Sequence, residues 1–226
     1  MNQFLHGMVR ATAESFDLAE PILEIGSYQV AGQEPIADLR SLFPGKKYVG
    51  VDKRPGPGVD CVADAESLPQ PSGSVGSVIA VSTFEHVPRF WRGFEEIYRV
   101  LRPDGVLLVA CPFYFYIHAF PNDYWRFTPA ALDLLLENYP TKISGWHGPA
   151  RRPINVWGLA FRELYAKPTH EQFQKYQSRL HLYARQPVRW KKKLRYHIGR
   201  ILFGRRPFAP YLEQDHWECQ CRNLAS

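Results

Sequence analysis

Apolar residues in the first half of the chain follow two alternating patterns. They recur at helical intervals over 4–19, 36–43 and 89–101. Between these stretches lie apolar runs of strand length, most of which end at a glycine or a polar residue. Five such runs cover 22–25, 47–51, 59–63, 75–81 and 106–110. Strands that alternate with helices at this spacing predict a parallel sheet with helices on both faces.

The pattern changes after residue 110. Residues 111–128 are aromatic and irregular, and Thr128 is the predicted N-cap of a helix over 130–138. The last predicted elements are two strands, over 142–146 and 159–166, and a basic, partly helical segment over 172–212.

The composition is that of a soluble globular protein, with 45% apolar and 22% charged residues. The N-terminal stretch lacks the uninterrupted apolar core of a secretory signal. The longest apolar run, Val106–Ile117, is about half of the roughly 20 residues that a membrane-spanning helix needs.

The cysteines favour a reducing compartment, and we expect a cytoplasmic protein. Cys61 and Cys111 lie in strand-like surroundings, where free thiols behave as small apolar groups. Cys219 and Cys221, near His216, lack a second pair at the spacing of zinc ligands. No metal site is therefore predicted.

Polar residues follow the predicted strands at the edge where ligands of open parallel sheets bind. Gly26, after the first strand, allows a tight turn close to a ligand. Asp52, after the second, can accept both hydroxyl protons of a ribose. The next glycine after Gly26 is Gly32, so G-x-G-x-x-G is missing and a pyrophosphate ligand is disfavoured.

Five segments follow one another in the first half of the chain: LEIGS (23–27), YVGVD (48–52), VADAESLP (62–69), VSTFEHV (81–87) and RVLRPDGVLLV (99–109). In this order they resemble the class I methyltransferases, which use S-adenosylmethionine. The phrase HAFPNDYWRFTPAAL (118–132) further resembles small bacterial methyltransferases associated with glycan or polysaccharide biosynthesis.

This resemblance implies an α/β, Rossmann-like, doubly wound and mostly parallel sheet of seven strands, the last one antiparallel. It implies a methyltransferase domain over 1–168, with a cofactor half over 22–110 and an acceptor-side loop over 111–128, followed by a basic extension over 169–226. It also implies roles in cofactor binding for Glu24, Gly26, Ser27, Asp52, Lys53, Asp64, Ala65, Ser82 and Phe84. Glu24, Gly26 and Ser27 would line its methionine part, Asp52 would hold the ribose, and Lys53, Asp64 and Ala65 would meet the adenine. Tyr28 stands where the class usually has a second glycine, so the path of this loop is open.

Methyl transfer to an alcohol gains from a base within hydrogen-bond reach, and His86, His118 and Asp123 are the candidates. Tyr124, Trp125 and Arg126 suit a sugar, because aromatic faces meet its C–H edges and charged groups take its hydroxyls. Two alternatives stay open: His86 starts a helix without a role in the site, or the aromatic residues are core and Arg126 pairs with Asp123.

Positive charge is confined to the C-terminal part. Residues 172–226 carry 12 Lys and Arg against 3 Asp and Glu, whereas residues 1–171 carry 16 against 19. Apolar residues interleave with the cations over 175–206, as in an amphipathic helix on the surface of an anionic membrane. Nucleic acid is the weaker alternative partner, and a solvated face or an oligomer contact is the third.

The sequence thus predicts O-methylation of a sugar, glycan or similar small metabolite with S-adenosylmethionine as cofactor. A nucleic acid or protein methyltransferase that uses the basic segment is an alternative, although the chain lacks the Asn/Asp-Pro-Pro-Tyr/Phe motif of amino-methylating nucleic acid enzymes. A catalytically silent binding module is another.

Overall fold

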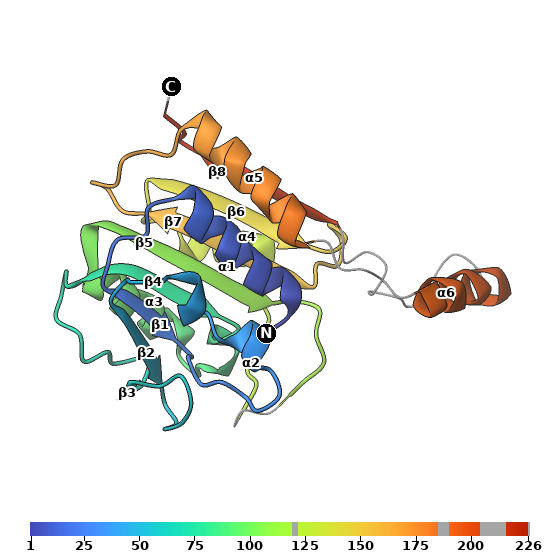
Figure 1. The fold of residues 1–226 in the computed structure, drawn as a ribbon, viewed down its shortest axis with the longest axis horizontal. Helices are drawn as coiled ribbons and strands as arrows, with labels where there is room; N and C mark the ends of the chain where they lie inside the picture. The colour runs from blue at the N-terminus through green and yellow to red at the C-terminus, as the bar shows by residue number, and fades with distance from the viewer. Residues whose placement is uncertain (119–121, 185–189, 204–215, 226) are drawn as a thin grey trace.

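The computed structural model describes residues 1–118, 122–184, 190–203 and 216–225. Within them, eight strands form one sheet in the order β3-β2-β1-β4-β5-β7-β6-β8 (Figure 1). The strands are β1 (Ile22–Ile25), β2 (Tyr48–Asp52), β3 (Cys61–Val62), β4 (Val75–Val81), β5 (Leu101–Pro112), β6 (Thr141–His147), β7 (Asn155–Phe161) and β8 (Trp217–Arg222). The first five strands in that order run parallel, while β7 is antiparallel to β5 and β6, and β8 to β6. This confirms the predicted Rossmann-like, mostly parallel fold.

The helices lie on both faces of this sheet, apart from α6. They are α1 (Gln3–Ser15), α2 (Glu34–Ala37), η1 (Arg40–Leu42), η2 (Phe84–His86), α3 (Phe90–Val100), α4 (Pro129–Leu135), α5 (His170–Ala184) and α6 (Trp190–Phe203). None of the described helices is long and apolar enough to span a membrane.

Strand residues alternate between two apolar cores, because successive side chains of a strand point to opposite faces. On β4, Ile79 packs in the core that contains α1 and α5, whereas Val78 packs in the core that contains α3. Both cores are therefore built from one continuous sheet, which holds the carboxyl ends of β1, β2 and β4 in register.

The predicted sheet of seven strands is wrong by one strand. β8 comes from the C-terminal segment and pairs with β6 from Lys142 to His147. Its burial alternates, with Trp217, Cys219 and Cys221 half-buried on the side of the α1 core. An eighth strand protects the backbone of β6, which would otherwise be a sheet edge.

The predicted boundary at 168 does not separate two packing units. Helix α5 lies alongside α1 (Figure 1), and its Tyr176 and Leu180 are fully buried. The indole nitrogen of Trp157 donates a 3.1 Å hydrogen bond to the hydroxyl of Tyr176. At Gly7 of α1, a Cβ would lie 2.8 Å from the Cβ of Tyr183, so glycine permits this close approach.

Three further expectations can be compared with the structure. The helix predicted over 36–43 is divided into α2 and η1, where Pro35 starts a single turn, and the third strand is limited to two residues. The predicted cap is confirmed, because the Thr128 hydroxyl accepts a 3.0 Å hydrogen bond from the Ala131 amide.

Candidate functional site

A cavity of about 880 Å³ opens at the carboxyl ends of β1, β2 and β4. The turn after β1 shapes its floor. Gly26 has φ +82°, and a Cβ there would lie 2.3 Å from the hydroxyl oxygen of Thr83. That hydroxyl donates a 2.8 Å hydrogen bond to the carbonyl of Ile25, so β4 and β1 are joined at this point. Only glycine fits the turn, and its backbone lines the cavity.

Asp52 presents its carboxylate to this cavity from the end of β2. Oδ1 accepts a 2.9 Å hydrogen bond from the amide of Arg54, and Oδ2 a 3.3 Å bond from that of Tyr28. These two amides orient the carboxylate, and each oxygen keeps further acceptor capacity for a ligand hydroxyl. Tyr28 and Arg54, which the sequence analysis did not single out, also line the cavity, with the guanidinium 4.3 Å above the Tyr28 ring.

Glu24 lies one residue before the end of β1 and also lines the cavity. Its Oε2 accepts a 2.9 Å hydrogen bond from the hydroxyl of Tyr48. Burial raises the pKa of the Glu24 carboxyl to about 7, against the opposing effect of that hydrogen bond. A cationic ligand would therefore find a carboxyl group that it can ionise.

Lys53, Asp64 and Ala65 form another part of the wall. The Lys53 ammonium lies 2.8 Å from Oδ2 of Asp64 and holds the pKa of that carboxyl below its usual range, in opposition to partial burial. Asp64 also accepts from the amide of Glu66 through Oδ1. The two charged side chains thus bind each other at the rim of the cavity.

Ser82 lines the cavity with φ +55°, a left-handed conformation that is rare for a residue with a Cβ. Two other predicted cofactor residues do not line it. The Ser27 side chain is buried against Gly50, and Phe84 is fully buried against Phe94 and beneath Gly93. Both shape the site only through packing.

The side chains of Glu85, His86 and His118 meet on the acceptor side of the cavity. His86 and His118 line it, and their rings lie 4.9 Å apart in an edge-on arrangement. Glu85 has a fully buried side chain whose Oε1 lies 3.9 Å from Nε2 of His86. Burial raises the pKa of the Glu85 carboxyl to about 8, and the sequence analysis did not identify this residue.

Asp123 does not line the cavity but holds two residues of the acceptor-side loop. Its Oδ2 lies 3.0 Å from Nδ1 of His118 and accepts a 2.9 Å hydrogen bond from the amide of the same residue. Arg126 binds both carboxylate oxygens of Asp123 through its two terminal nitrogens. The geometry therefore gives Asp123 a positioning role. It also pairs Arg126 with Asp123, which is one of the two alternatives that the sequence left open.

Some aromatic residues of the loop line the cavity and others do not. The amides of Tyr124 and Trp125 donate to the carbonyl of Glu85, which fastens the loop to η2, and neither side chain lines the cavity. Phe115 and Tyr116 do line it, with 44% and 72% of their surfaces exposed. No pattern in the sequence distinguishes these two residues from the other aromatic residues of the loop. They make the mouth of the cavity apolar.

Comparisons with known proteins agree with this geometry. Residues 23–109 match the family model described as a methyltransferase domain. A comparison with curated proteins finds no match.

Three solved structures share the fold at low sequence identity. A methyltransferase from Archaeoglobus fulgidus that depends on S-adenosylmethionine has a TM-score of 0.54 and 15% identity over 70% of this chain and 93% of that one. The YcgJ protein from Bacillus subtilis has a TM-score of 0.52 and 17% identity over 70% and 98%. The 1,6-didemethyltoxoflavin-N1-methyltransferase of Burkholderia thailandensis, solved with S-adenosylhomocysteine, has a TM-score of 0.51 and 14% identity over 71% and 79%.

The cavity fits S-adenosylmethionine by the chemistry of its wall. Glu24, Asp52 and Asp64 offer three carboxyl groups to a ligand with a sulfonium, an ammonium, a ribose and an adenine amine. Gly26 brings bare backbone to the same wall. Residues 23–109 thus match a methyltransferase domain, the chain is an enzyme with S-adenosylmethionine-dependent methyltransferase activity, and its cofactor is S-adenosylmethionine.

Proposed function

We propose that this S-adenosylmethionine-dependent methyltransferase transfers the methyl group to a hydroxyl oxygen of a sugar or glycan. One observation carries the proposal: Phe115 and Tyr116 are exposed at the mouth of the same cavity into which His86 and His118 face. Aromatic faces pack on the C–H surfaces of sugar rings, while imidazole nitrogens bind hydroxyl groups.

The chain's residues supply orientation rather than elaborate acid–base chemistry. Bound S-adenosylmethionine supplies a methyl group on a positively charged sulfur, and an oxygen nucleophile must lie in line with it. His86 and His118 are placed to engage that oxygen, and Asp123 orients His118 through the 3.0 Å contact of its Oδ2 with Nδ1. The peptide of Glu85, bound by the amides of Tyr124 and Trp125, fixes the loop that carries these groups.

The first experiment offers the purified full chain, with S-adenosylmethionine, a panel of free sugars, nucleotide sugars and oligosaccharides. Production of S-adenosylhomocysteine together with an O-methyl group on a sugar, identified by mass and NMR, is the expected result. Methyl transfer to an amine, a nucleic acid or a protein, with no sugar methylated, would replace this function by the corresponding alternative. Cofactor binding without transfer to any class of acceptor would favour a silent binding module.

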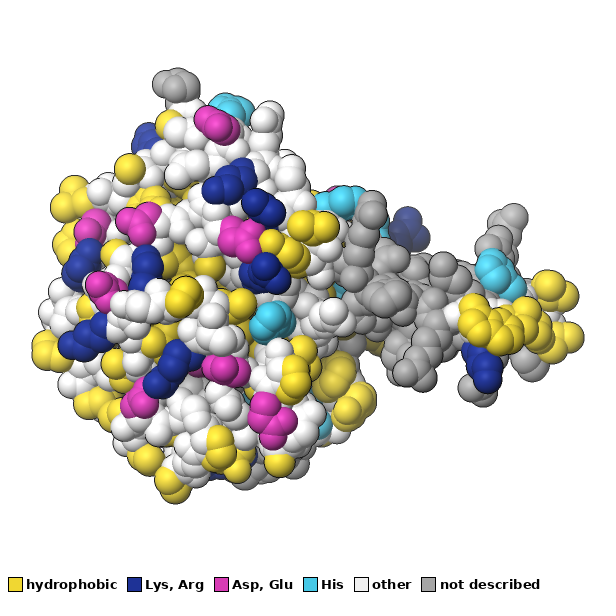
Figure 2. Space-filling view, in the orientation of Figure 1, with side chains coloured by type: hydrophobic (Ala, Val, Ile, Leu, Met, Phe, Trp, Pro, Cys, Tyr) yellow, Lys and Arg dark blue, Asp and Glu magenta, His cyan; other side chains and the backbone are white. Residues whose placement is uncertain are grey.

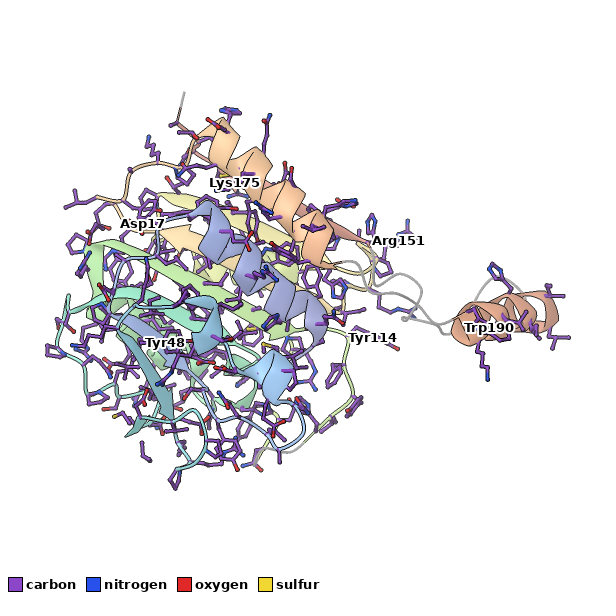
Figure 3. All side chains as sticks on the ribbon, viewed as in Figure 1. Asp17, Tyr48, Tyr114, Arg151, Lys175 and Trp190 are labelled. Carbon is purple, nitrogen blue, oxygen red and sulfur yellow. The ribbon has the colours of Figure 1, made fainter. Side chains whose placement is uncertain are left out.

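Once an acceptor is found, Tyr116→Ala tests the aromatic platform. The KM for the sugar should rise about two- to tenfold, because an aromatic contact is worth about 0.5–1.5 kcal/mol, whereas the Kd for S-adenosylmethionine should not change. Leu164→Ala is the matched control, since Leu164 is 73% exposed and does not line the cavity. Trp190, 69% exposed on α6 (Figure 3), is unsuitable because it belongs to the surface considered below for membrane contact. Equal effects of the two variants would remove Tyr116 from the acceptor site.

We further propose that the basic segment contacts an anionic membrane, which suits a lipid-linked glycan acceptor at the inner membrane surface. Within the predicted range 175–206, of which 185–189 and 204–206 lie outside the described residues, Arg179 of α5 pairs with Glu14 of α1 at 3.1 Å. We therefore assign the membrane contact to α6 and not to α5. Helix α6, in contrast, lies apart from the sheet and its helices, with apolar side chains on its visible face (Figure 2). Five apolar side chains of α6 are at least 47% exposed, namely Trp190, Leu194, Ile198, Ile201 and Leu202.

These apolar positions recur at intervals of three and four residues, and the sequence of α6 has five Lys and Arg and no acidic residue. Each cation near an anionic surface adds about 1 kcal/mol, so charge favours a membrane over an apolar partner. Vesicles of phosphatidylcholine with and without phosphatidylglycerol provide the test by cosedimentation. We expect binding only with the anionic lipid, lost in Leu194→Glu and kept in Leu164→Glu, which changes an exposed leucine of the body. Preferential binding to duplex DNA or RNA would overturn the membrane proposal.

A further inference from the structure

Glu85, His86 and His118 lie close enough to share one small ligand. Each offers one potential ligand atom, and these three atoms lie within 4.8 Å of one another. The three residues come from η2 and from the loop after β5, which the contacts of Asp123 and of the Glu85 carbonyl hold together. The sequence predicts no metal site, because its cysteines lack the spacing of zinc ligands and no local pattern places His118 beside Glu85.

The buried carboxyl group of Glu85 indicates that this ligand is a cation. Its side chain is 1% exposed, and its Oε2 is buried without a hydrogen-bond partner among the described residues. Two cations lie near Glu85. The Met1 ammonium acts on it through its charge but does not hydrogen-bond Oε2, and Arg126 is already bound by both oxygens of Asp123. A buried polar atom without a partner costs about 1–3 kcal/mol, and more when it is charged. A bound cation would remove that cost.

Both imidazoles have the second contact that orients metal-binding histidines. Nδ1 of His86 lies 2.6 Å from the carbonyl oxygen of Asn122, and Nδ1 of His118 lies 3.0 Å from Oδ2 of Asp123. Histidines that bind metals usually donate the other ring N–H to a carbonyl or a carboxylate in this way. Such contacts set the ring orientation before an ion arrives.

We propose that Glu85, His86 and His118 bind a divalent transition-metal ion, such as zinc or manganese, at the acceptor end of the cavity. Two imidazoles and one carboxylate form a three-ligand set that leaves coordination positions open for a substrate. Ligand atoms about 2.0–2.2 Å from one ion lie about 3–4 Å apart, so the three side chains need to close by only about an ångström.

The role of this ion in the reaction rests on the proposed function, whereas its binding does not. With the remaining ring nitrogens of His86 and His118 bound to the ion, the histidines would engage the acceptor oxygen through it. A cation beside the acceptor hydroxyl would lower the pKa of that group. The hydroxyl proton passes to solvent, the oxygen forms a bond to the methyl carbon, and the carbon–sulfur bond breaks as S-adenosylhomocysteine leaves. The sum is one alcohol and one sulfonium converted to one ether, one thioether and one proton.

Metal binding by the full chain tests the inference without an acceptor. Protein stripped with EDTA is titrated with Co²⁺, whose visible absorption reports imidazole and carboxylate ligands, and bound Co²⁺ is then displaced with Zn²⁺. We expect one ion per chain, and a loss of affinity of about tenfold or more in both Glu85→Gln and His118→Ala. His216→Ala is the matched control, because His216 pairs with Glu218 of β8 and does not belong to the proposed metal site.

Circular dichroism establishes whether each variant is folded. If the variant at the buried Glu85 does not fold, His118→Ala still tests the site, because the His118 side chain is 22% exposed. Absence of stoichiometric binding to the wild-type chain, or unchanged affinity in folded His118→Ala, overturns the metal site. Sugar methylation that is unchanged after EDTA treatment, with no ion bound, overturns it while leaving the proposed function intact. A bound ion in a chain that methylates only another class of acceptor overturns the proposed function and leaves the metal site.

Discussion

The hydroxyl of Tyr48 on β2 donates a 2.9 Å hydrogen bond to the carboxyl group of Glu24 on the neighbouring strand β1. Both groups are at most 9% exposed. Burial raises the pKa of Glu24 to about 7, while the bond from Tyr48 and the charge of Arg40 lower it and the carboxylates of Asp38 and Asp52 raise it. Glu24 is therefore an ionisable group of the cofactor cavity that titrates near neutral pH.

This pKa predicts a stability that falls with rising pH. Glu24 holds its proton up to about pH 7 in the folded chain but only up to about pH 4.5 in the unfolded chain. Its protonation therefore contributes fully to stability below pH 4.5, and this contribution is lost as the pH rises from 4.5 to 7. The free energy of unfolding of the wild type, relative to Glu24→Gln, should decrease by about 3 kcal/mol over that window. Urea denaturation at several pH values measures it, with Glu137→Gln, at an exposed residue just after α4, as control. Parallel pH profiles of the wild type and Glu24→Gln would contradict the prediction.

Asp52→Asn should weaken cofactor binding without unfolding the chain. One of the two amides, of Tyr28 or of Arg54, keeps an oxygen acceptor in the variant. The charge that strengthens hydrogen bonds from ribose hydroxyls is lost. A hydrogen bond to a charged group is worth about 1.5–3 kcal/mol, so the Kd for S-adenosylmethionine should rise about tenfold or more in calorimetric titration. Asp104→Asn, at the amino-terminal end of β5, should bind as the wild type does.

Gly26→Ala should destabilise the chain more than Gly32→Ala does. Both glycines have φ near +80°, so each substitution carries a backbone cost of about 1–2 kcal/mol. At Gly32 nothing lies within 4 Å of the new methyl group, whereas at Gly26 it would lie 2.3 Å from the Thr83 hydroxyl. Overpacking should add about 1–3 kcal/mol at Gly26. Thermal denaturation compares the two variants, and equal midpoints would show that the turn has room.

Leu180→Ala should be far more costly than Leu182→Ala on the same helix. Leu180 of α5 is fully buried in the core shared with α1, while Leu182 is 57% exposed. Truncation of a buried leucine costs about 2–5 kcal/mol, and an exposed one about 0.5 kcal/mol or less. Urea denaturation of both variants decides whether α5 belongs to the folded unit. A small effect at Leu180 would restore the boundary at 168.

Local pattern was enough for most elements of the first half and for the polar ends of the strands, but not for the divided helix over 36–43 or the short third strand. The apolar run over 75–81 and the helical spacing over 89–101 reappear as β4 and α3, because each pattern is strong and local. Gly26 and Asp52 were identified from position alone, since the carboxyl ends of parallel strands share one edge. The residues of the acceptor side could not be predicted in this way, because an irregular aromatic loop has no periodicity that indicates which side chains face the cavity.

The amino-acid sequence by itself determined the alternation of strands and helices, the cofactor class and the location of the positive charge. Only the tertiary structure decided that α5 and β8 complete the cores and the sheet, since long-range packing fixes which amphipathic segments become buried. It also brought Glu85 and His86 of η2 beside His118, and placed Phe115 and Tyr116, rather than Tyr124 and Trp125, at the cavity. Proximity between residues distant in the chain depends on how the loop folds back over η2, and that path is set by hydrogen bonds that no local pattern encodes.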